Sequence, residues 1–128
     1  MIFVVGGSYN NKLNFVLEKY NLKHEDVYNG EMDTPYKGER IVYNFHEIVK
    51  RMLREKKYND EILQFVKTLL KREDLIIISD EVGYGIVPIS KEDRYFREMN
   101  GRISCYIAKE AREVYRVMYG IGKKIKGE

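Results

Sequence analysis

The fold of this chain is decided by residues 75–88, which read LIIISDEVGYGIVP. Four apolar residues in succession, from Leu75 to Ile78, are too few for a helix and are typical of a strand that is buried on both faces, as in parallel sheets. Ligands of such sheets bind beyond the carboxyl ends of the strands. The carboxylates that follow the strand, Asp80 and Glu81, are therefore predicted to border a ligand-binding crevice.

The rest of this stretch has the composition of a binding loop. Glycines at Gly83 and Gly85 allow a sharp turn or a close approach of the backbone to a ligand. Pro88 prevents the segment from extending as an inner strand. The predicted site therefore includes Gly83 and Gly85 together with the two carboxylates.

Strands alternate with helices along the remainder of the chain. Apolar spacing predicts strands over residues 1–5, 27–28, 40–43, 75–79, 114–118 and 123–126, the last two forming a hairpin through Gly120 and Gly122. Helices are predicted over residues 13–20, 44–56, 60–70 and from about residue 91 onward. Asn59 or Asp60 is expected to cap the third helix and Ser90 the fourth, which Asn100-Gly101 should interrupt or bend.

This alternation predicts a three-layer α/β/α sandwich with a mainly parallel sheet and an antiparallel edge strand, in one domain over residues 1–128. The chain is 44% hydrophobic and 34% charged, as expected of an ordered globular protein. A net charge of +3, with acids and bases interleaved, argues against a nucleic-acid surface. Apolar runs are too short for a membrane span and no signal-like region precedes Ile2, so we expect a cytoplasmic protein. Cys105, the single cysteine, excludes an internal disulfide and is expected to be at least half-buried.

Residues 6–13, which read GGSYNNKL, follow the first strand and occupy the place of a phosphate-binding loop. In the motif G-x-x-x-x-G-K-[ST], backbone N–H groups cradle phosphates, the lysine neutralises charge and the hydroxyl holds Mg²⁺. Gly6 and Lys12 are in register with it. Asn11 replaces the second glycine, and asparagine tolerates a positive φ well, whereas Leu13 has no atom that can bind a metal. The predicted phosphate-binding residues are Gly6, Gly7, Ser8, Asn11 and Lys12.

Further motifs follow in order after Pro88. They are Arg94-Tyr95-Phe96-Arg97-Glu98, Gly101-Arg102-Ile103, residues 108–115 and Gly120-Ile121. With residues 75–88 they resemble the C-terminal half of the bifunctional adenosylcobinamide kinase / adenosylcobinamide-phosphate guanylyltransferase family. The similarity is dense over residues 74–126 and looser over the first 20. It implies a P-loop NTPase type of fold, ATP or GTP as ligand, a place in cobalamin biosynthesis and a homotrimer.

The resemblance also indicates what this chain lacks. The family's second Mg²⁺-associated group is an aspartate at the end of a buried strand, and Asn44 occupies that position, so a role for Mg²⁺ is doubtful and no metal site is predicted. The family's guanylylated histidine precedes that strand, where this chain has only His24, in a charged surface stretch. His46 follows the strand and is interpreted as a non-catalytic histidine in the first turn of a helix. No catalytic residue is assigned.

Three functions remain open. A shortened, diverged relative would bind a nucleotide or another phosphorylated small molecule with a degenerate loop and without efficient transfer. An active nucleotide-dependent transferase is the second possibility. The third is a non-catalytic interaction protein, in which Asp80 and Glu81 only expose polar groups to water at the end of a strand or cap it.

Overall fold

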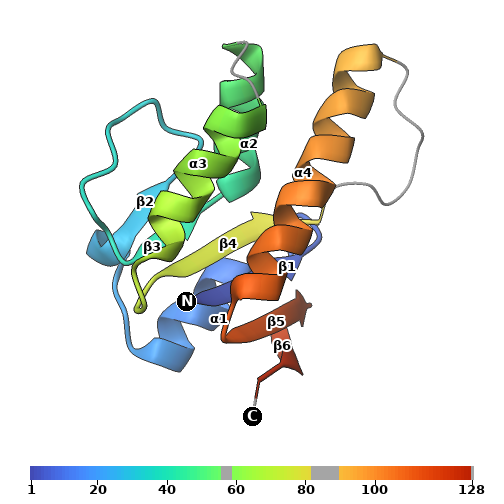
Figure 1. Ribbon diagram of the computed structural model, residues 1–128. Helices are drawn as coiled ribbons and strands as arrows, with labels where there is room; N and C mark the ends of the chain where they lie inside the picture. The colour runs from blue at the N-terminus through green and yellow to red at the C-terminus, as the bar shows by residue number, and fades with distance from the viewer. Residues whose placement is uncertain (56–58, 82–89, 128) are drawn as a thin grey trace.

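A computed structural model describes residues 1–55, 59–81 and 90–127, which form a six-stranded sheet with helices on both faces (Figure 1). The strands are β1 (Ile2–Gly6), β2 (Val27–Asn29), β3 (Ile41–Tyr43), β4 (Ile76–Asp80), β5 (Glu113–Met118) and β6 (Ile121–Lys126). Their order in the sheet is β2-β3-β4-β1-β5-β6. Neighbours run parallel except β5 and β6. The predicted α/β sandwich with an antiparallel edge strand is confirmed.

The helices are α1 (Lys12–Tyr20), α2 (Phe45–Arg54), α3 (Asn59–Leu70) and α4 (Lys91–Glu110), and a short 3₁₀ helix η1 spans His24–Asp26. Helix α1 covers one face of the sheet, and α2, α3 and α4 cover the other (Figure 1). The isoleucines of β4 show why the central strands need both layers. Ile76 and Ile78 pack into the core with Val16 of α1, whereas Ile77 packs into the opposite core.

The fourth helix begins where the sequence predicts, because the Ser90 hydroxyl accepts a hydrogen bond from the backbone N–H of Asp93. The expected interruption at Asn100-Gly101 is wrong, since α4 continues to Glu110. Glycine in a helix costs about 1 kcal/mol relative to alanine. Burial of Met99, Ile103 and Ile107 along one stripe of the helix outweighs that cost.

Two smaller expectations are also wrong. The cap expected from Asp60 is one of them, because helix α3 already begins at Asn59 and Asp60 lies in its first turn. The alternative cap, Asn59, stays a prediction, since its side chain lies outside the described part. Cys105 is exposed, because it lies on α4 away from the stripe that packs on the sheet. None of the helices described is both long enough and apolar enough to cross a membrane.

The C-terminal hairpin is confirmed, and its turn is formed by Tyr119 (φ 53°) and Gly120 (φ 76°). Two consecutive positive φ values are typical of the tight turns that suit the twist of a hairpin. Gly122 lies within β6 instead of at the turn. A Cβ atom there would overlap the ring of Phe15, so this glycine lets α1 pack closely against the edge strand.

Candidate functional site

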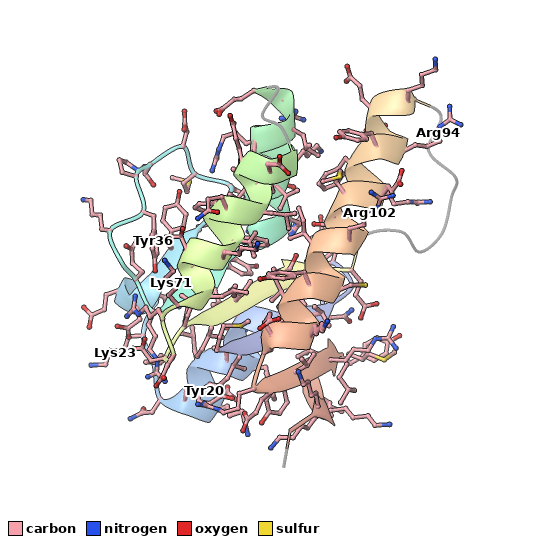
Figure 2. All side chains as sticks on the ribbon, in the orientation of Figure 1. Tyr20, Lys23, Tyr36, Lys71, Arg94 and Arg102 are labelled. Carbon is pink, nitrogen blue, oxygen red and sulfur yellow. The ribbon has the colours of Figure 1, made fainter. Side chains whose placement is uncertain are left out.

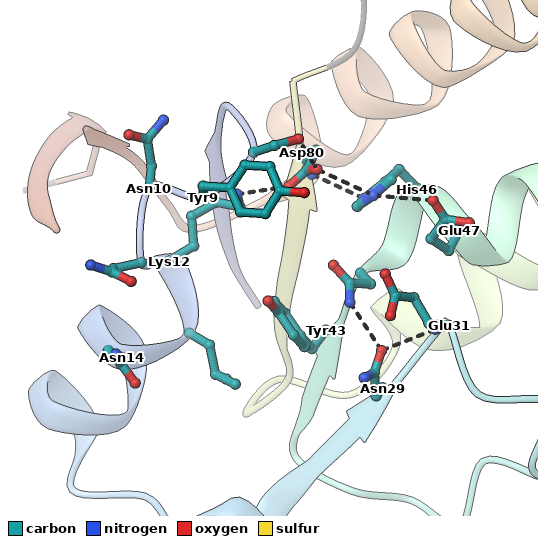
Figure 3. Close-up of a pocket in the computed structure, with 14 residues that line it drawn as sticks. Tyr9, Asn10, Lys12, Asn14, Asn29, Glu31, Tyr43, His46, Glu47 and Asp80 are labelled. Atoms are coloured by element: carbon teal, nitrogen blue, oxygen red, sulfur yellow. Dashed lines mark hydrogen bonds and ion pairs between the residues drawn. The ribbon is translucent and has the colours of Figure 1, made fainter. Parts of the chain in front are cut away.

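A pocket of about 650 Å³ lies where the carboxyl ends of β1, β3 and β4 meet the first turns of α1 and α2 (Figure 3). This is the edge of a parallel sheet at which ligands bind. Among the described residues, the lining is mostly polar and includes five asparagines and three acids. The lining residues are Ser8, Tyr9, Asn10, Asn11, Lys12, Leu13, Asn14, Asn29, Glu31, Tyr43, Asn44, His46, Glu47 and Asp80.

Lys12 is the first residue of α1 and, in the part of the chain that the structure describes, the only lysine in this lining. Its side chain is 5% exposed, and its ammonium nitrogen lies 2.8 Å from the carbonyl oxygen of Gly7 and 2.7 Å from Oδ1 of Asp80. Lys12 and Asp80 therefore lie at the same end of the sheet, as the sequence predicts. The contact with Gly7 folds the side chain back over the loop from which the helix begins.

Asn11 has a left-handed backbone, with φ 59° and ψ 37°. Asn11 therefore adopts the positive φ that asparagine is expected to tolerate at this position. The Asn11 side chain makes no capping hydrogen bond to the helix. The first backbone N–H groups of α1 have no acceptor within the helix, so they add positive potential to that of Lys12.

Asn10 joins the predicted phosphate-binding loop of residues 6–13, the phosphate loop, to the C-terminal hairpin. Its side-chain and backbone oxygens accept hydrogen bonds from the backbone N–H groups of Tyr119 (3.1 Å) and Gly120 (3.0 Å). Its amide nitrogen donates to the carbonyl oxygen of Gly7. A Cβ atom on Gly6 would lie 2.4 Å from the carbonyl oxygen of Val117, so glycine is needed where β1 passes the hairpin.

The carboxylate of Asp80 accepts hydrogen bonds from two parts of the phosphate loop. Oδ1 binds Lys12, and Oδ2 lies 2.8 Å from the hydroxyl of Ser8. Burial raises the pKa of this carboxyl, but the bonds from Lys12 and Ser8 outweigh burial and hold the pKa below its usual value. Asp80 is therefore ionised at neutral pH.

His46 is buried in the pocket wall, next to Asp80 (Figure 3). Its Nδ1 accepts the backbone N–H of Asp80 at 3.1 Å, which places the proton of the neutral ring on Nε2. Nε2 lies 3.4 Å from Oδ2 of Asp80 and 3.6 Å from Oε1 of Glu47. Burial lowers the pKa of His46, although the two carboxylates act in the opposite direction.

At Asn44, where the resemblance implies a metal-associated aspartate, the chain has an amide that already has a partner. Asn44 precedes α2 with φ 57°, and its side-chain nitrogen donates to Oδ1 of Asn29 at 3.0 Å. Leu13 also lines the pocket but offers only carbon. Within residues 1–55, 59–81 and 90–127, no group of three or more His, Cys, Asp or Glu side chains is arranged to hold a metal ion.

Glu81 shares a smaller cavity beside α4 with Asp80 but, unlike Asp80, does not line the main pocket. Both side-chain oxygens of Glu81 accept hydrogen bonds from Arg116, at 2.7 and 3.1 Å. Gly83 and Gly85 lie outside the described residues. Gly6 and Gly7 do not line the pocket. The carbonyl oxygen of Gly7 accepts hydrogen bonds from the side chains of Asn10 and Lys12.

Residues of the C-terminal motifs lie away from the pocket on α4. Arg94 and Arg102 extend outward from this helix (Figure 2), and Arg102 forms an ion pair with Glu98 one turn earlier. His24 is exposed on η1 and does not line the pocket, in agreement with its interpretation as a surface residue.

Sequence reasoning missed the part of the site contributed by β2, β3 and α2. His46, Glu47 and Glu31 line the pocket, yet none of them belongs to the predicted site. Their position in the sequence was an available signal. His46 and Glu47 lie in the first turn of a helix that follows a buried parallel strand, and the carboxyl end of such a strand faces the crevice.

Comparisons with known proteins show similarity to one family over most of the chain. The family described as cobinamide kinase / cobinamide phosphate guanyltransferase matches residues 35–125, a range that includes β3, β4 and α4 but not the phosphate loop. The bifunctional adenosylcobalamin biosynthesis protein CobU of Escherichia coli is 46% identical over 52 residues, and that of Salmonella typhimurium is 44% identical. Each match spans 41% of this chain and 29% of the relative.

Proposed function

This chain belongs to the cobinamide kinase / cobinamide phosphate guanyltransferase family, and we propose that it binds ATP, GTP or another phosphorylated small molecule in the pocket at Lys12. We further propose that it does so without efficient phosphoryl or guanylyl transfer. The matched segment covers 29% of the curated relatives. The proposal for the binding site therefore rests on the residues of this chain.

The observation that carries the proposal is the position of Lys12. A buried ammonium at the first residue of α1 acts on the same volume as the free N–H groups of that helix. Such a combination favours an anion, and phosphate in particular. The left-handed Asn11 supports the proposal because it preserves the shape of the loop where the motif has glycine.

The absence of efficient transfer is proposed from the residues at the two metal-associated positions. Leu13 has no oxygen, and the amide of Asn44 is hydrogen-bonded to Asn29. Phosphoryl transfer depends on electrostatic stabilisation of the transferring group, to which Mg²⁺ contributes several kcal/mol. With neutral side chains at both positions, ligand binding is retained and the chemical step is slow.

The other residues of the predicted site have different roles in this proposal. Ser8 and Asp80 position Lys12, and Glu81 supports the loop because its backbone N–H donates to the carbonyl oxygen of Gly6. Gly83 and Gly85 are proposed to border the ligand because glycines allow the backbone to turn sharply or approach a ligand closely. The resemblance supports a homotrimer. The interleaved charges and the short apolar runs of the sequence support the absence of nucleic-acid and membrane partners and a cytoplasmic location.

An active transferase in cobalamin biosynthesis is the second candidate, and the carboxylates of Asp80, Glu31 and Glu47 favour it. All three line the pocket and are of the type that binds Mg²⁺, although among the described residues they are not arranged as a group that could hold a metal ion. If they replace the missing metal support, incubation with α-labelled GTP should produce a protein-bound label that is stable in alkali and labile in acid. The proposed function predicts no such label on the wild-type protein.

A thermal-shift panel tests the proposed binding directly. ATP, GTP, ADP, GDP and adenosine are compared with and without Mg²⁺, because a ligand that binds only the folded state must raise the melting temperature. We expect the phosphorylated ligands to stabilise the protein and adenosine to have no effect. No shift with any phosphorylated ligand at millimolar concentration would contradict the proposal.

A further inference from the structure

We propose that Asp80 sets the anion affinity of the pocket by acting as an internal competitor for Lys12. A phosphate group then binds only to the extent that it displaces or shares the Asp80 carboxylate. The inference rests on the proposed function, because it concerns the anion site at Lys12. It adds a specificity-determining residue that lies on β4 and outside the loop motif.

Lys12 has little capacity left for a ligand while this ion pair is intact. An ammonium group has three donors. One is directed at the carbonyl oxygen of Gly7 and a second at Oδ1 of Asp80, 2.7 Å away. The positive charge is therefore neutralised by a carboxylate in a partly buried setting, where screening by water is weak.

The carboxylate is also held in place by donors that a phosphate would use. Oδ2 of Asp80 accepts from the hydroxyl of Ser8 at 2.8 Å, and Nε2 of His46 lies 3.4 Å away. The backbone N–H of Asp80 is anchored to Nδ1 of His46. Asp80 thus presents two oxygens to Lys12 and Ser8 in the manner of a bound oxyanion.

Glu47 provides a matched comparison within the same pocket. Its carboxylate lines the pocket and lies 3.6 Å from Nε2 of His46. Among the described residues, it forms no ion pair with Lys12. Neutralising Glu47 removes the same unit of charge from the lining but leaves the Lys12–Asp80 pair intact, so it separates general repulsion from direct competition.

The experiment is calorimetric titration of pyrophosphate into the wild-type protein, Asp80→Asn, Glu47→Gln, Lys12→Ala and the Asp80→Asn/Lys12→Ala double variant at neutral pH. We expect Asp80→Asn to bind pyrophosphate about tenfold or more tightly than the wild type, which corresponds to about 1.4 kcal/mol. Glu47→Gln should change the affinity by less than about threefold, because it leaves Lys12 paired. In the double variant the gain should disappear.

Two results would overturn the inference while leaving the proposed function in place. One is equal affinity of the wild type and Asp80→Asn, and the other is a gain that persists without Lys12 or is matched by Glu47→Gln. If none of the proteins binds pyrophosphate, the proposed function fails as well. Circular dichroism verifies folding of each variant, and Asp80→Ser, which keeps an acceptor for Lys12, replaces Asp80→Asn if the latter does not fold.

Discussion

The ammonium nitrogen of Lys12 lies 2.7 Å from Oδ1 of Asp80, and this ion pair joins the start of α1 to the end of β4. The two residues meet because α1 follows β1 through a short loop, and Gly6 at the end of β1 is in register with Asp80 on the adjacent parallel strand β4. The same pair gives the phosphate loop its shape and limits its net charge. The backbone of the loop, its contact with the hairpin and the Mg²⁺ dependence of nucleotide affinity can each be tested.

Asn11→Ala should destabilise the protein by about 1 to 2 kcal/mol, the cost of a left-handed backbone for an ordinary L-residue. Asn11→Gly should be close to neutral, because glycine adopts that conformation freely. Urea denaturation measures both. Asn14→Ala, on the exposed side of the same helix, serves as control. Equal stability of Asn11→Ala and Asn11→Gly would show that the positive φ of Asn11 is not a constraint.

Asn10→Ala should weaken the attachment of the phosphate loop to the hairpin. It removes the acceptor of the Tyr119 N–H and the donor to the carbonyl oxygen of Gly7. Loss of a typical hydrogen bond costs about 1 kcal/mol, so a decrease of 1 to 2 kcal/mol in the free energy of unfolding is expected. Hydrogen exchange of the Tyr119 and Gly120 amides should become faster; unchanged exchange at both positions would contradict the predicted attachment.

Stability should decrease on acidification, and His46 should account for part of the decrease. Its pKa is lowered in the folded protein, so below the ordinary value of 6.5 the unfolded chain binds the proton more readily. This contribution to stability is present above pH 6.5 and is lost as the pH falls toward the folded pKa. The lowered pKa of Asp80 acts in the same direction at lower pH, where its contribution is lost as the pH falls through its folded pKa.

His46→Asn should therefore flatten the pH dependence of the unfolding free energy between pH 7 and pH 5, while its amide oxygen can still accept the Asp80 N–H. His24→Asn, on the exposed η1, is the control and should leave the curve unchanged. If the unfolding free energy of the wild type and of His46→Asn depended on pH with the same slope, the lowered pKa of His46 would not contribute to stability.

Nucleotide affinity should depend little on Mg²⁺. Leu13 supplies no ligand atom, and the Asn44 amide is held by Asn29. Titrations of GTP in EDTA and in excess Mg²⁺ should differ by less than about tenfold, or about 1.4 kcal/mol. A larger gain with Mg²⁺ would identify the carboxylates of the pocket as metal ligands.

The sequence predicted the order of strands and helices because local patterns determine it. The apolar run that forms β4 buries both faces, and Ser90 is placed to cap α4. Local patterns were misleading at Asn100-Gly101, where packing of the rest of α4 outweighs a helix-breaking pair. They could not predict the exposure of Cys105, which depends on how α4 is rotated against the sheet.

The candidate site was only half predicted, for a similar reason. Lys12 and Asp80 belong to motifs that can be recognised along the chain, and the structure brings them together. His46, Glu47 and the contact of Asn10 with the hairpin depend on which strands are adjacent in the sheet. That adjacency arises from tertiary packing. Sequence position shows that His46 and Glu47 follow a buried strand, but it does not show which strands are neighbours in the sheet.

Calorimetric titration of GTP into the wild type, Lys12→Ala and Lys91→Ala tests the central claim most directly. Lys91 is the first residue of α4 and is exposed, so it is a lysine at an equivalent helix position outside the pocket. We predict saturable binding to the wild type and to Lys91→Ala, and a loss of about 2 kcal/mol, or roughly 30-fold, for folded Lys12→Ala. Unchanged GTP affinity in Lys12→Ala, or no binding to the wild type, would contradict an anion site at Lys12.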